Sequence, residues 1–536
     1  MVLLAAACGS AKENQATNDT TPTEAAAGDV IVSSDKAPVA GGSLIYALTA
    51  ETNTWDPGTG QWASSGSIVA RAVFDTLTTW NAEGEAVPFL AESVEPTDQA
   101  MTEWEITLRP GVTFHDGTAL DAEVLKENID HLRESPTVGA ALAVIDTVEV
   151  SGDLSVLVAT SQPFGIMREA LTGQAGTIAS PKMWETPEGG RVPIGTGPFV
   201  FREWEPSRRL IVDKNPDYWR EGLPYLEEIE FQITTDSQTR ATAMTTGTVD
   251  MLEAQEAGLV NRLIDGAADG SYQVLTNTEL EGSKSLLIFN ATKAPFDDLE
   301  VRRAITMGID TQALSTGASE GLNTPARSML STDSPYFSDA EYPSYDPDAA
   351  KAIIDEYEAA NGPISFQLNS PPDPEITVTA QAIQSQLADI GVDLKVNGID
   401  QTSLIVAAVT GTYDSTLFRL FGSPVPDAQT AFISPETNLP VGQVSLNIAH
   451  LDDPPTGAAI DELFAAADPA AKGAAYTKLQ DAVASSLPFV YLLEVTSAIA
   501  ADNSVRGFDS WTLPDGSPGL SQSETVPMLA QIWVDR

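Results

Sequence analysis

The sequence is poor in the residues that build covalently fixed or metal-bound sites. Among 536 residues it has 1 cysteine, Cys8, and 3 histidines, His115, His131 and His450. A single cysteine excludes a disulfide within the chain and a cluster of thiolate metal ligands. Three histidines so far apart in the sequence do not indicate a histidine metal site. We therefore expect neither a bound metal nor a cofactor.

Positive charge is also scarce. The chain has 28 lysines and arginines against 76 aspartates and glutamates, a formal net charge of −48 at pH 7. A field of that sign repels the phosphates of nucleic acids and anionic lipids, so we expect no nucleic-acid partner. It also repels further copies of the chain, which favours a monomer. The acidity fits either a solubility adaptation or a function in handling cations.

No internal apolar run is long enough to span a bilayer. The one membrane-related signal is the short run before Cys8, where three alanines precede the cysteine and Gly9 and Ser10 follow it. It resembles the end of a bacterial lipoprotein signal peptide. We expect residues 1–8 to be the remnant of that signal, with a lipid on Cys8. We expect residues 9–40, which lack large apolar groups, to be a flexible tether.

Local patterns place several elements in the chain. From Pro193 to Trp219, a GTGPF turn is followed by an alternating aromatic segment and a second apolar segment, which predicts a β-hairpin. Residues 64–80 have a one-sided apolar pattern and predict a helix capped by Ser64 or Ser65. Asp121 precedes a second segment with a one-sided apolar pattern, which predicts another helix with Asp121 as its N-cap. Beyond residue 289, helices and strands alternate, which predicts an α/β lobe with parallel pairing.

A possible enzyme motif occurs at residues 317–321, where GASEG matches the G-x-S-x-G pattern around Ser319. This nucleophile motif needs a strand before the serine and a helix after it. Here a helical segment precedes the serine, and Pro325 interrupts the segment after it. The sequence therefore disfavours an esterase, and we expect a protein that is not an enzyme.

Four strings together resemble the extracellular solute-binding proteins of the peptide/nickel class, the cluster C receptors of ABC importers. They are WEITLRPGVTFHDGTALDAEVL, GTGPFVFREW with KNPDYW, FNATKAPFDDLEVRRAITMGID and QLADIGVDLKV, and the matching order runs from about Gly41 to Phe508. The resemblance implies a type II periplasmic-binding-protein-like α/β fold, whose two lobes close on a small ligand, with an extra inserted domain. It also implies partnership with the permease subunits of an importer.

By the same resemblance, the domains occupy definite parts of the chain. The expected divisions are lobe one at 41–73, 186–288 and 495–536, the inserted domain at 74–185, and lobe two at 289–494. The protein is then expected at the outer face of the cytoplasmic membrane or in the periplasm, held to the membrane by its lipid anchor only.

The resemblance also points to residues 413–432 as part of the ligand site. Peptide-binding relatives have a Trp there, followed by an Asp that pairs with the peptide's amino group; these positions fall on Arg419 and Gly422. The chain has no acid between Asp414 and Asp427, which disfavours recognition of a free amine. A guanidinium instead presents paired donors to a carboxylate or phosphate.

The expected function is an extracytoplasmic receptor for a small solute that is peptide-like or otherwise bears a carboxylate. A metal chelate or a glycoside is the alternative ligand, and a signalling or adhesion role on the same fold stays open. For Arg419 the alternative is an ion pair with an acid of the chain, and for Phe421 it is packing in the core. For Trp55 and Asp56, which lie on the first loop of the folded body (residues 51–60), the alternative is a purely structural role. The candidate ligand-binding residues are Trp55, Asp56, Glu253, Gln255, Arg419, Leu420, Phe421, Gly422 and Asp427.

Overall fold

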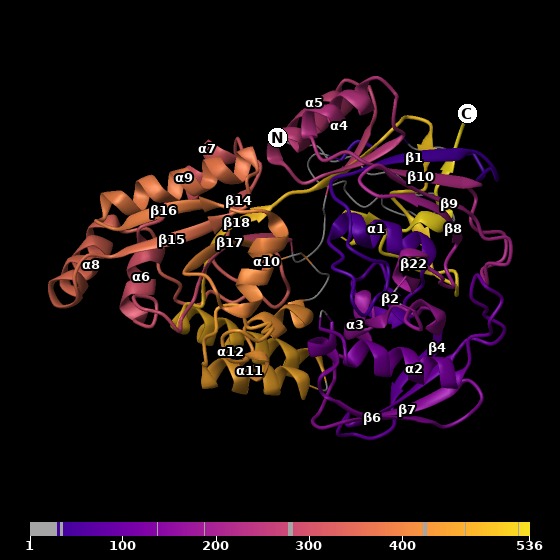
Figure 1. Cartoon of the computed structure of the whole chain (residues 1–536), viewed down its shortest axis with the longest axis horizontal. Coiled ribbons are helices and arrows are strands. Elements are labelled where there is room, and N and C mark those ends of the chain that lie inside the picture. The colour runs from indigo at the N-terminus through magenta and orange to yellow at the C-terminus, as the bar shows by residue number, and fades with distance from the viewer. Residues whose placement is uncertain are drawn as a thin grey trace, which may run out of the picture.

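The computed structural model describes residues 29–32, 36–136, 138–186, 188–276, 282–420, 422, 426–466, 468–523 and 525–536. These residues form two lobes, each built around one mixed β-sheet (Figure 1). Cys8, most of the expected tether and Phe421 lie outside the described residues, so the roles that the sequence predicts for them stay predictions. No helix in the described ranges is long and apolar enough to cross a membrane.

Lobe one has a seven-stranded sheet with β1 at its centre. Its order is β12 (Gln273–Thr276), β19 (Ala498–Ala501), β11 (Met251–Ala254), β1 (Ser43–Leu48), β10 (Glu228–Ile233), β9 (Arg209–Lys214) and β8 (Phe199–Glu205). Strand β1 is parallel to β10 and β11. Leu44, Tyr46 and Leu48 face one apolar cluster, whereas Ala47 faces another. This alternation follows from the two-residue period of a strand and means that both faces of the sheet are buried.

Helices α1 (Ser64–Val73), α4 (Ser237–Thr245) and α5 (Ala257–Ala268) also belong to lobe one. The predicted hairpin is confirmed, because β8 and β9 pair antiparallel. The predicted helix at 64–80 is too long: α1 ends at Val73, Phe74 is extended, and β2 (Thr78–Trp80) follows. The serine cap is also wrong, because Ala63 takes the N-cap position and no side chain caps the helix.

The early end of α1 has a tertiary cause. The N–H of Gly197, in the GTGPF turn, donates to the carbonyl of Val73 at 2.9 Å. The turn thereby occupies the space into which the helix would continue. Beyond it, the run Thr76, Thr78 and Thr79 is rich in β-branched residues, which favour strands.

Below the lobe-one sheet in Figure 1 lies the region of the expected inserted domain. Its antiparallel sheet has the order β4 (Ala91–Pro96), β5 (Glu103–Leu108), β7 (Ser155–Thr160) and β6 (Ile145–Val150). Helix α2 (Ala122–Arg133) covers this sheet, and the predicted cap is confirmed, because Asp121 accepts a hydrogen bond from Val124 N at 3.0 Å. The short elements β3 (Ala86–Pro88) and α3 (Met167–Ala170) also lie in this part.

Lobe two has a six-stranded sheet. Its order is β14 (Thr324–Pro325), β18 (Phe489–Val495), β13 (Ser283–Phe289), β17 (Ser415–Leu420), β15 (Ser365–Ser370) and β16 (Asp393–Gly398). The predicted parallel pairing holds for β15 with β16 and β17, whereas β13 pairs antiparallel with both its neighbours. Its helices are α6 (Leu299–Met307), α7 (Thr311–Ala318), α8 (Pro347–Asn361), α9 (Pro374–Asp389), α10 (Gln401–Thr410), α11 (Pro454–Phe464) and α12 (Pro469–Ser486).

The chain passes between the two sheets from β12 to β13 and returns from β18 to β19 (Figure 1). Because β13 pairs with β17 and β18 from Ser283 onward, the first crossing lies before Ser283. The expected boundary after residue 288 is therefore too late. Two adjacent crossings of this kind act as a hinge between lobes.

The packing of Gly197 gives a stability test. A Cβ atom at Gly197 would lie 2.5–2.7 Å from backbone atoms of Val73 and Phe74, whereas one at Gly173 would meet nothing within 4 Å. We expect Gly197→Ala to lower stability by about 1–3 kcal/mol, because backbone must move to admit the methyl group. Thermal unfolding followed by circular dichroism measures the change. Gly173→Ala is the matched control, and equal midpoints for the two variants would contradict this account.

Candidate functional site

Two of the sequence-predicted residues meet across the lobes. Arg419 lies on β17 of lobe two, and Gln255 directly follows β11 of lobe one. Arg419 Nη1 donates a hydrogen bond to Gln255 Oε1 at 3.0 Å. The carboxyl ends of the parallel strands β1 and β11 meet at this edge of the lobe-one sheet. Crevices at the carboxyl ends of strands and between lobes are where α/β proteins bind small ligands.

Ser64 extends this contact into lobe one. Gln255 Nε2 donates to Ser64 Oγ at 2.8 Å, so the amide of Gln255 is held at both ends. The sequence suggested Ser64 only as a helix cap, and nothing in the spacing of Ser64, Gln255 and Arg419 indicates that they meet. Because a carboxamide carries no charge, the contact positions the guanidinium without neutralising it.

Glu253 lies beside this contact but is completely buried. Its carboxylate accepts hydrogen bonds from the backbone N–H and hydroxyl of Thr49, both at 3.0 Å, from Thr525 Oγ1 at 3.2 Å, and from Ser65 Oγ. Burial raises the pKa of Glu253, although these donors act in the opposite direction. The carboxyl group therefore ties the end of β1 to the start of α1, and we reassign Glu253 from ligand contact to support of the site.

Asp56 anchors the first loop. Its carboxylate accepts from Gly58 N at 2.8 Å, Thr59 Oγ1 at 2.8 Å and His131 Nε2 at 2.9 Å. Burial raises the pKa of Asp56, but these hydrogen bonds outweigh it and hold the pKa below its ordinary value. The His131 ring stacks on Trp184 at 4.2 Å between centroids. The loop is thereby fastened to α2, which supports the structural alternative for Asp56; its expected ligand role stays a prediction.

The remaining candidates are also engaged by the protein. Trp55 is 3% exposed and packs edge-on against Trp204, with centroids 5.7 Å apart. Leu420 belongs to an apolar cluster of lobe two. Gly422 N donates to Ser283 Oγ at 3.0 Å, and glycine has no side chain that could pair with an amine. Trp55 and Leu420 therefore contribute packing around the site.

Asp427 lies in the interior of lobe two. Its side chain is completely buried, and it accepts from Lys472 Nζ at 2.7 Å and Tyr476 OH at 2.6 Å. Lys472 Nζ also lies 3.6 Å from Glu169 Oε1 of α3. Burial lowers the pKa of Lys472, but the two carboxylates outweigh it and raise the pKa. Asp427 is thus a structural partner of α12, which favours a supporting role, and its expected role as a ligand contact stays a prediction.

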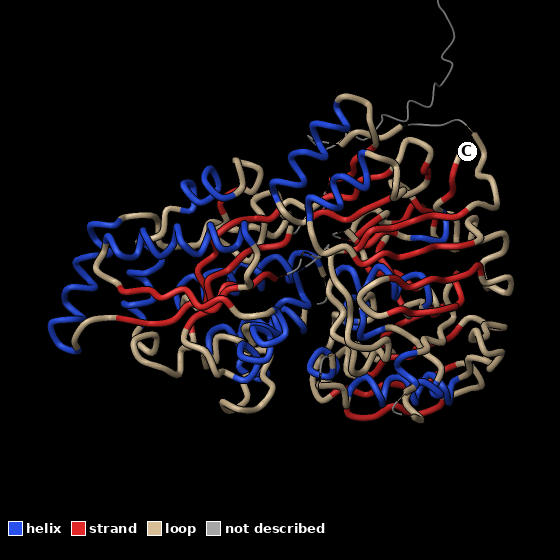
Figure 2. Tube along the Cα trace, turned by 45° about the horizontal axis from the view of Figure 1, so that its top comes forward, coloured by secondary structure: helices blue, strands red, loops and turns tan. Residues whose placement is uncertain are grey.

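A second set of contacts joins the lobes far from the hinge. Gly165 N donates to the carbonyl of Phe464 at 2.9 Å, and the rings of Phe164 and Phe464 pack edge-to-face with centroids 5.8 Å apart. Phe464 ends α11 of lobe two, whereas residues 164 and 165 precede α3. The lobes therefore touch at both ends of the face between them. Figure 2 shows the strands of the lobes as two separate groups that flank this face.

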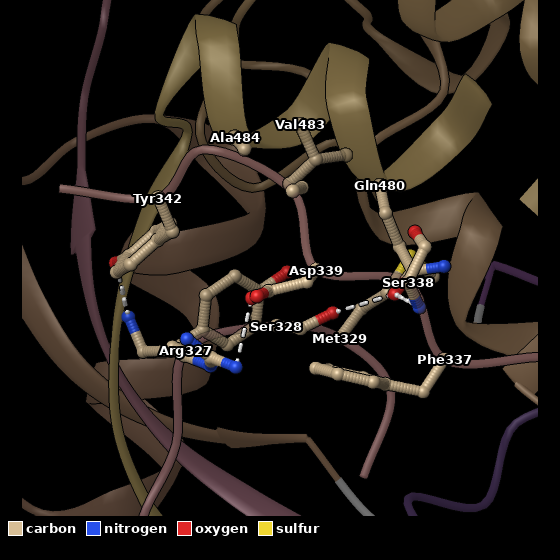
Figure 3. Close-up of a pocket in the computed structure, with 12 residues that line it drawn as sticks. Arg327, Ser328, Met329, Phe337, Ser338, Asp339, Tyr342, Gln480, Val483 and Ala484 are labelled. Atoms are coloured by element: carbon tan, nitrogen blue, oxygen red, sulfur yellow. Dashed lines mark hydrogen bonds and ion pairs between the residues drawn. The ribbon is translucent and has the colours of Figure 1, made fainter. Parts of the chain in front are cut away.

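The cavity drawn in Figure 3 lies within lobe two, between α12 and the 327–342 segment. Its volume of about 10 Å³ is sufficient for roughly one water molecule. Arg327 and Asp339 pair on its rim at 2.8 Å. It is too small for a solute and is remote in sequence from Gln255. Within the described ranges, no group of three or more His, Cys, Asp or Glu side chains could hold a metal ion.

The G-x-S-x-G match does not form a nucleophile site. Ser319 directly follows α7 rather than a strand, and its side chain is 1% exposed. Its Oγ donates to the carbonyl of Ser315 at 2.8 Å. The motif therefore lacks the strand-to-helix turn that exposes a catalytic serine.

The reassignment of Asp427 is open to test. We expect Asp427→Ala to lower the thermal midpoint clearly, because removing one partner of a buried ion pair costs about 3–5 kcal/mol. We also expect solute affinity to stay within about threefold, measured by calorimetry on the folded variant. Asp481→Ala removes an exposed acid of α12, the helix that provides Lys472 and Tyr476, and serves as control. A large loss of affinity without loss of stability would restore Asp427 to the ligand site.

Comparison with known proteins agrees with this architecture. Residues 85–439 match the family described as bacterial extracellular solute-binding proteins, family 5 Middle. The glutathione-binding protein GsiB of Pectobacterium atrosepticum is 25% identical over 464 residues, which are 84% of this chain and 88% of that protein. The nickel-binding periplasmic protein of Escherichia coli is 27% identical over 374 residues, 66% of this chain and 70% of the relative.

A solved structure extends the similarity to three dimensions. The binding protein AgaA from A. tumefaciens R10, in complex with agropinic acid, superimposes with a TM-score of 0.81 and 26% identity. The match covers 92% of this chain and 99% of AgaA. MoaA from the same source, in complex with mannopinic acid, gives a TM-score of 0.77 at 21% identity over 92% of this chain and 99% of its own.

Proposed function

Because this chain belongs to the bacterial extracellular solute-binding proteins of family 5, we propose that it captures a carboxylate-bearing solute between its lobes. The family carries the type II two-lobed α/β fold, which confirms the predicted fold class, and it works as the receptor component of ABC importers. The observation that carries the proposal is the hydrogen bond from Arg419 of lobe two to Gln255 of lobe one. It puts a guanidinium at the face where the lobes meet.

The chemistry of Arg419 favours an anionic solute. A guanidinium offers a planar fork of donors that fits a carboxylate, and its contact with Gln255 is a hydrogen bond to a neutral amide. A hydrogen bond with a charged partner contributes about 1.5–3 kcal/mol, or one to two decades in affinity. Two similar structures hold ligands that are acids by name. Gly422 offers no acid to a free amine, so an ordinary peptide terminus is the less suitable ligand.

A metal chelate is the second candidate ligand. The relative from Escherichia coli is named as nickel-binding, and a chelator's carboxylates would use the same guanidinium. The two candidates differ in one measurable respect, because only a chelate requires the metal. Calorimetric titration of the solute with and without a chelating competitor separates them.

The remaining features of the proposal concern the whole chain. The protein acts outside the cytoplasm, as the family does. We propose that a lipid on Cys8 anchors it, that residues 9–40 act as a tether, and that the protein works as a monomer. The proposed domains keep the expected division, with the start of lobe two moved to Ser283.

Identifying the solute tests the proposal. Native mass spectrometry of the purified protein, followed by a thermal-shift screen of opines, glutathione, peptides, glycosides and metal chelates, should return an acid. Small-angle scattering with the saturating solute should then show compaction, because the solute contacts both lobes. A neutral solute, or binding without compaction, would contradict the proposal.

Variants of Arg419 give the residue-level test. We expect Arg419→Ala to weaken binding of the identified acid by about 10- to 100-fold, because it removes a hydrogen bond from a charged group. Arg419→Lys should recover part of the loss, because it restores the charge but not the fork. Arg303→Ala, which removes a half-buried arginine of α6 that pairs with Glu300, is the control. Calorimetry that finds the same affinity for Arg419→Ala and Arg303→Ala would refute the role of Arg419.

A further inference from the structure

A cavity of about 470 Å³ lies where the proposed inserted domain meets lobe one. Three separate stretches of the chain line it, one around β4 and β5, one shortly after the β8–β9 hairpin and one near the C-terminus; they include Glu92, Arg109, Trp219, Arg220 and Pro514. Its lining residues take no part in the contacts between the lobes described above. The cavity is therefore separate from the proposed solute site.

A small aromatic cluster holds two guanidiniums at this cavity. The ring of Phe89 packs edge-on against the rings of Trp219 and Trp511, with centroids 5.3 Å and 5.4 Å apart. The guanidinium carbon of Arg109 lies 5.5 Å from the ring centroid of Trp219. That of Arg220 lies 5.1 Å from the ring centroid of Trp511. Aromatic faces attract a cation but carry no net charge, so they position both guanidiniums without neutralising them.

Backbone carbonyls fix the direction of the same two side chains. Arg109 Nε donates to the carbonyl of Phe89 at 2.6 Å, and Arg220 Nη2 donates to the carbonyl of Thr512, in β21 (Trp511–Thr512), at 2.5 Å. Arg220 Nη1 is buried and has no hydrogen-bond partner among the described residues. A buried donor without an acceptor costs free energy, so an acceptor from outside the chain is favoured at this position.

The lack of a carboxylate partner sets these two arginines apart. Elsewhere on lobe one, Arg202 pairs with Asp213 at 2.8 Å. Within the ranges that the structure describes, neither Arg109 nor Arg220 forms an ion pair, although the chain has 76 acids for 28 lysines and arginines. Both Nη groups of Arg109, and Nε and Nη1 of Arg220, thus have no acceptor in that part of the chain.

The two positive charges also act on each other. Burial lowers the pKa of Arg220, and the charge of Arg109 lowers it further, whereas the charge of Asp75 opposes both. Burial lowers the pKa of Arg109 as well, against the opposing charges of Glu92 and Asp515. The guanidiniums are therefore close enough to repel one another, and an anion between them relieves that repulsion.

We propose that this cavity binds a small dianionic oxyanion, a phosphate or a dicarboxylate, between Arg109 and Arg220. Two guanidiniums supply two positive charges, and their N–H donors match the paired oxygens of a phosphate or carboxylate group. Because its residues come from both the inserted domain and lobe one, the bound ion ties these two parts together. Solute capture at Arg419 does not depend on this ion.

Two exposed acids, Glu92 and Glu221, line the same cavity and are the competing partners of the arginines. If either carboxylate paired with the guanidiniums in solution, the positive charge would already be neutralised and the ion would not bind. Direct measurement of binding therefore separates the proposed site from an internal ion pair.

Equilibrium dialysis with radiolabelled inorganic phosphate, and in parallel with radiolabelled succinate, tests the site. The full chain carries Arg419→Ala, so that the proposed solute site does not contribute. We expect one ion per chain, bound about 10- to 100-fold more weakly after Arg109→Ala, because this removes charged hydrogen-bond donors. Arg208→Ala removes an exposed arginine of the β8–β9 turn and should leave binding unchanged. Tighter binding of phosphate assigns a phosphate ligand, and tighter binding of succinate assigns a dicarboxylate.

Thermal unfolding provides a second measurement and shows that each variant is folded. The bound ion stabilises only the native state, so phosphate or succinate should raise the thermal midpoint of the parent chain and of Arg208→Ala, but much less that of Arg109→Ala. The proposal is overturned if neither ion shows saturable binding, if the folded Arg109→Ala variant binds as tightly as the parent, or if chloride displaces the ion at equal concentration. Each of these results leaves the role of Arg419 untouched.

Discussion

The hydrogen bond between Arg419 and Gln255 is the interaction on which the proposed binding site depends. It links a strand of one lobe to the end of a strand in the other, and it does so with a neutral acceptor. A glutamate in place of Gln255 would pair with the guanidinium and cancel its charge. A carboxamide fixes the direction of the guanidinium and adds no negative charge of its own. The surrounding structure can be understood as the support that keeps these two side chains opposite one another.

That support is largely polar and buried. Glu253 joins the end of β1 to the start of α1 through hydroxyl and backbone donors, and Ser64 holds the far end of the Gln255 amide. Asp56 and His131 fasten the neighbouring loop to α2. A buried polar group that loses its hydrogen-bond partner costs free energy, so a fully bonded network of this kind strongly favours one geometry. On the proposed function, the solute meets this lobe-one surface, and closure of the lobes brings Arg419 to it.

The sequence predicted the fold well wherever the signal was local. The hairpin at residues 199–214 and the cap at Asp121 depend on patterns within one element, and both are confirmed. The helix at 64–80 failed because the turn around Gly197, more than a hundred residues later, ends it at Val73. The position of the first crossing failed because strand pairing, rather than composition, decides which sheet β13 joins.

The site was harder to predict for the same reason. The sequence pointed to Arg419 and Gln255 separately, and their meeting across 164 positions could not be derived from spacing. Their role in binding a solute stays a prediction. For Asp427, the sequence could not show the partners Lys472 and Tyr476, because they come from a helix that packs on it only in the folded lobe. The role of an acidic residue in such a segment cannot be assigned until the residues that contact it are known.

The most direct test of the central claim is a structure of the protein with the solute that co-purifies with it. If Arg419 recognises the solute, an acidic group of that solute lies within hydrogen-bonding distance of the Arg419 guanidinium, and both lobes contact the solute. A bound solute that has no anionic group, or that keeps its anionic group away from Arg419, would contradict the claim.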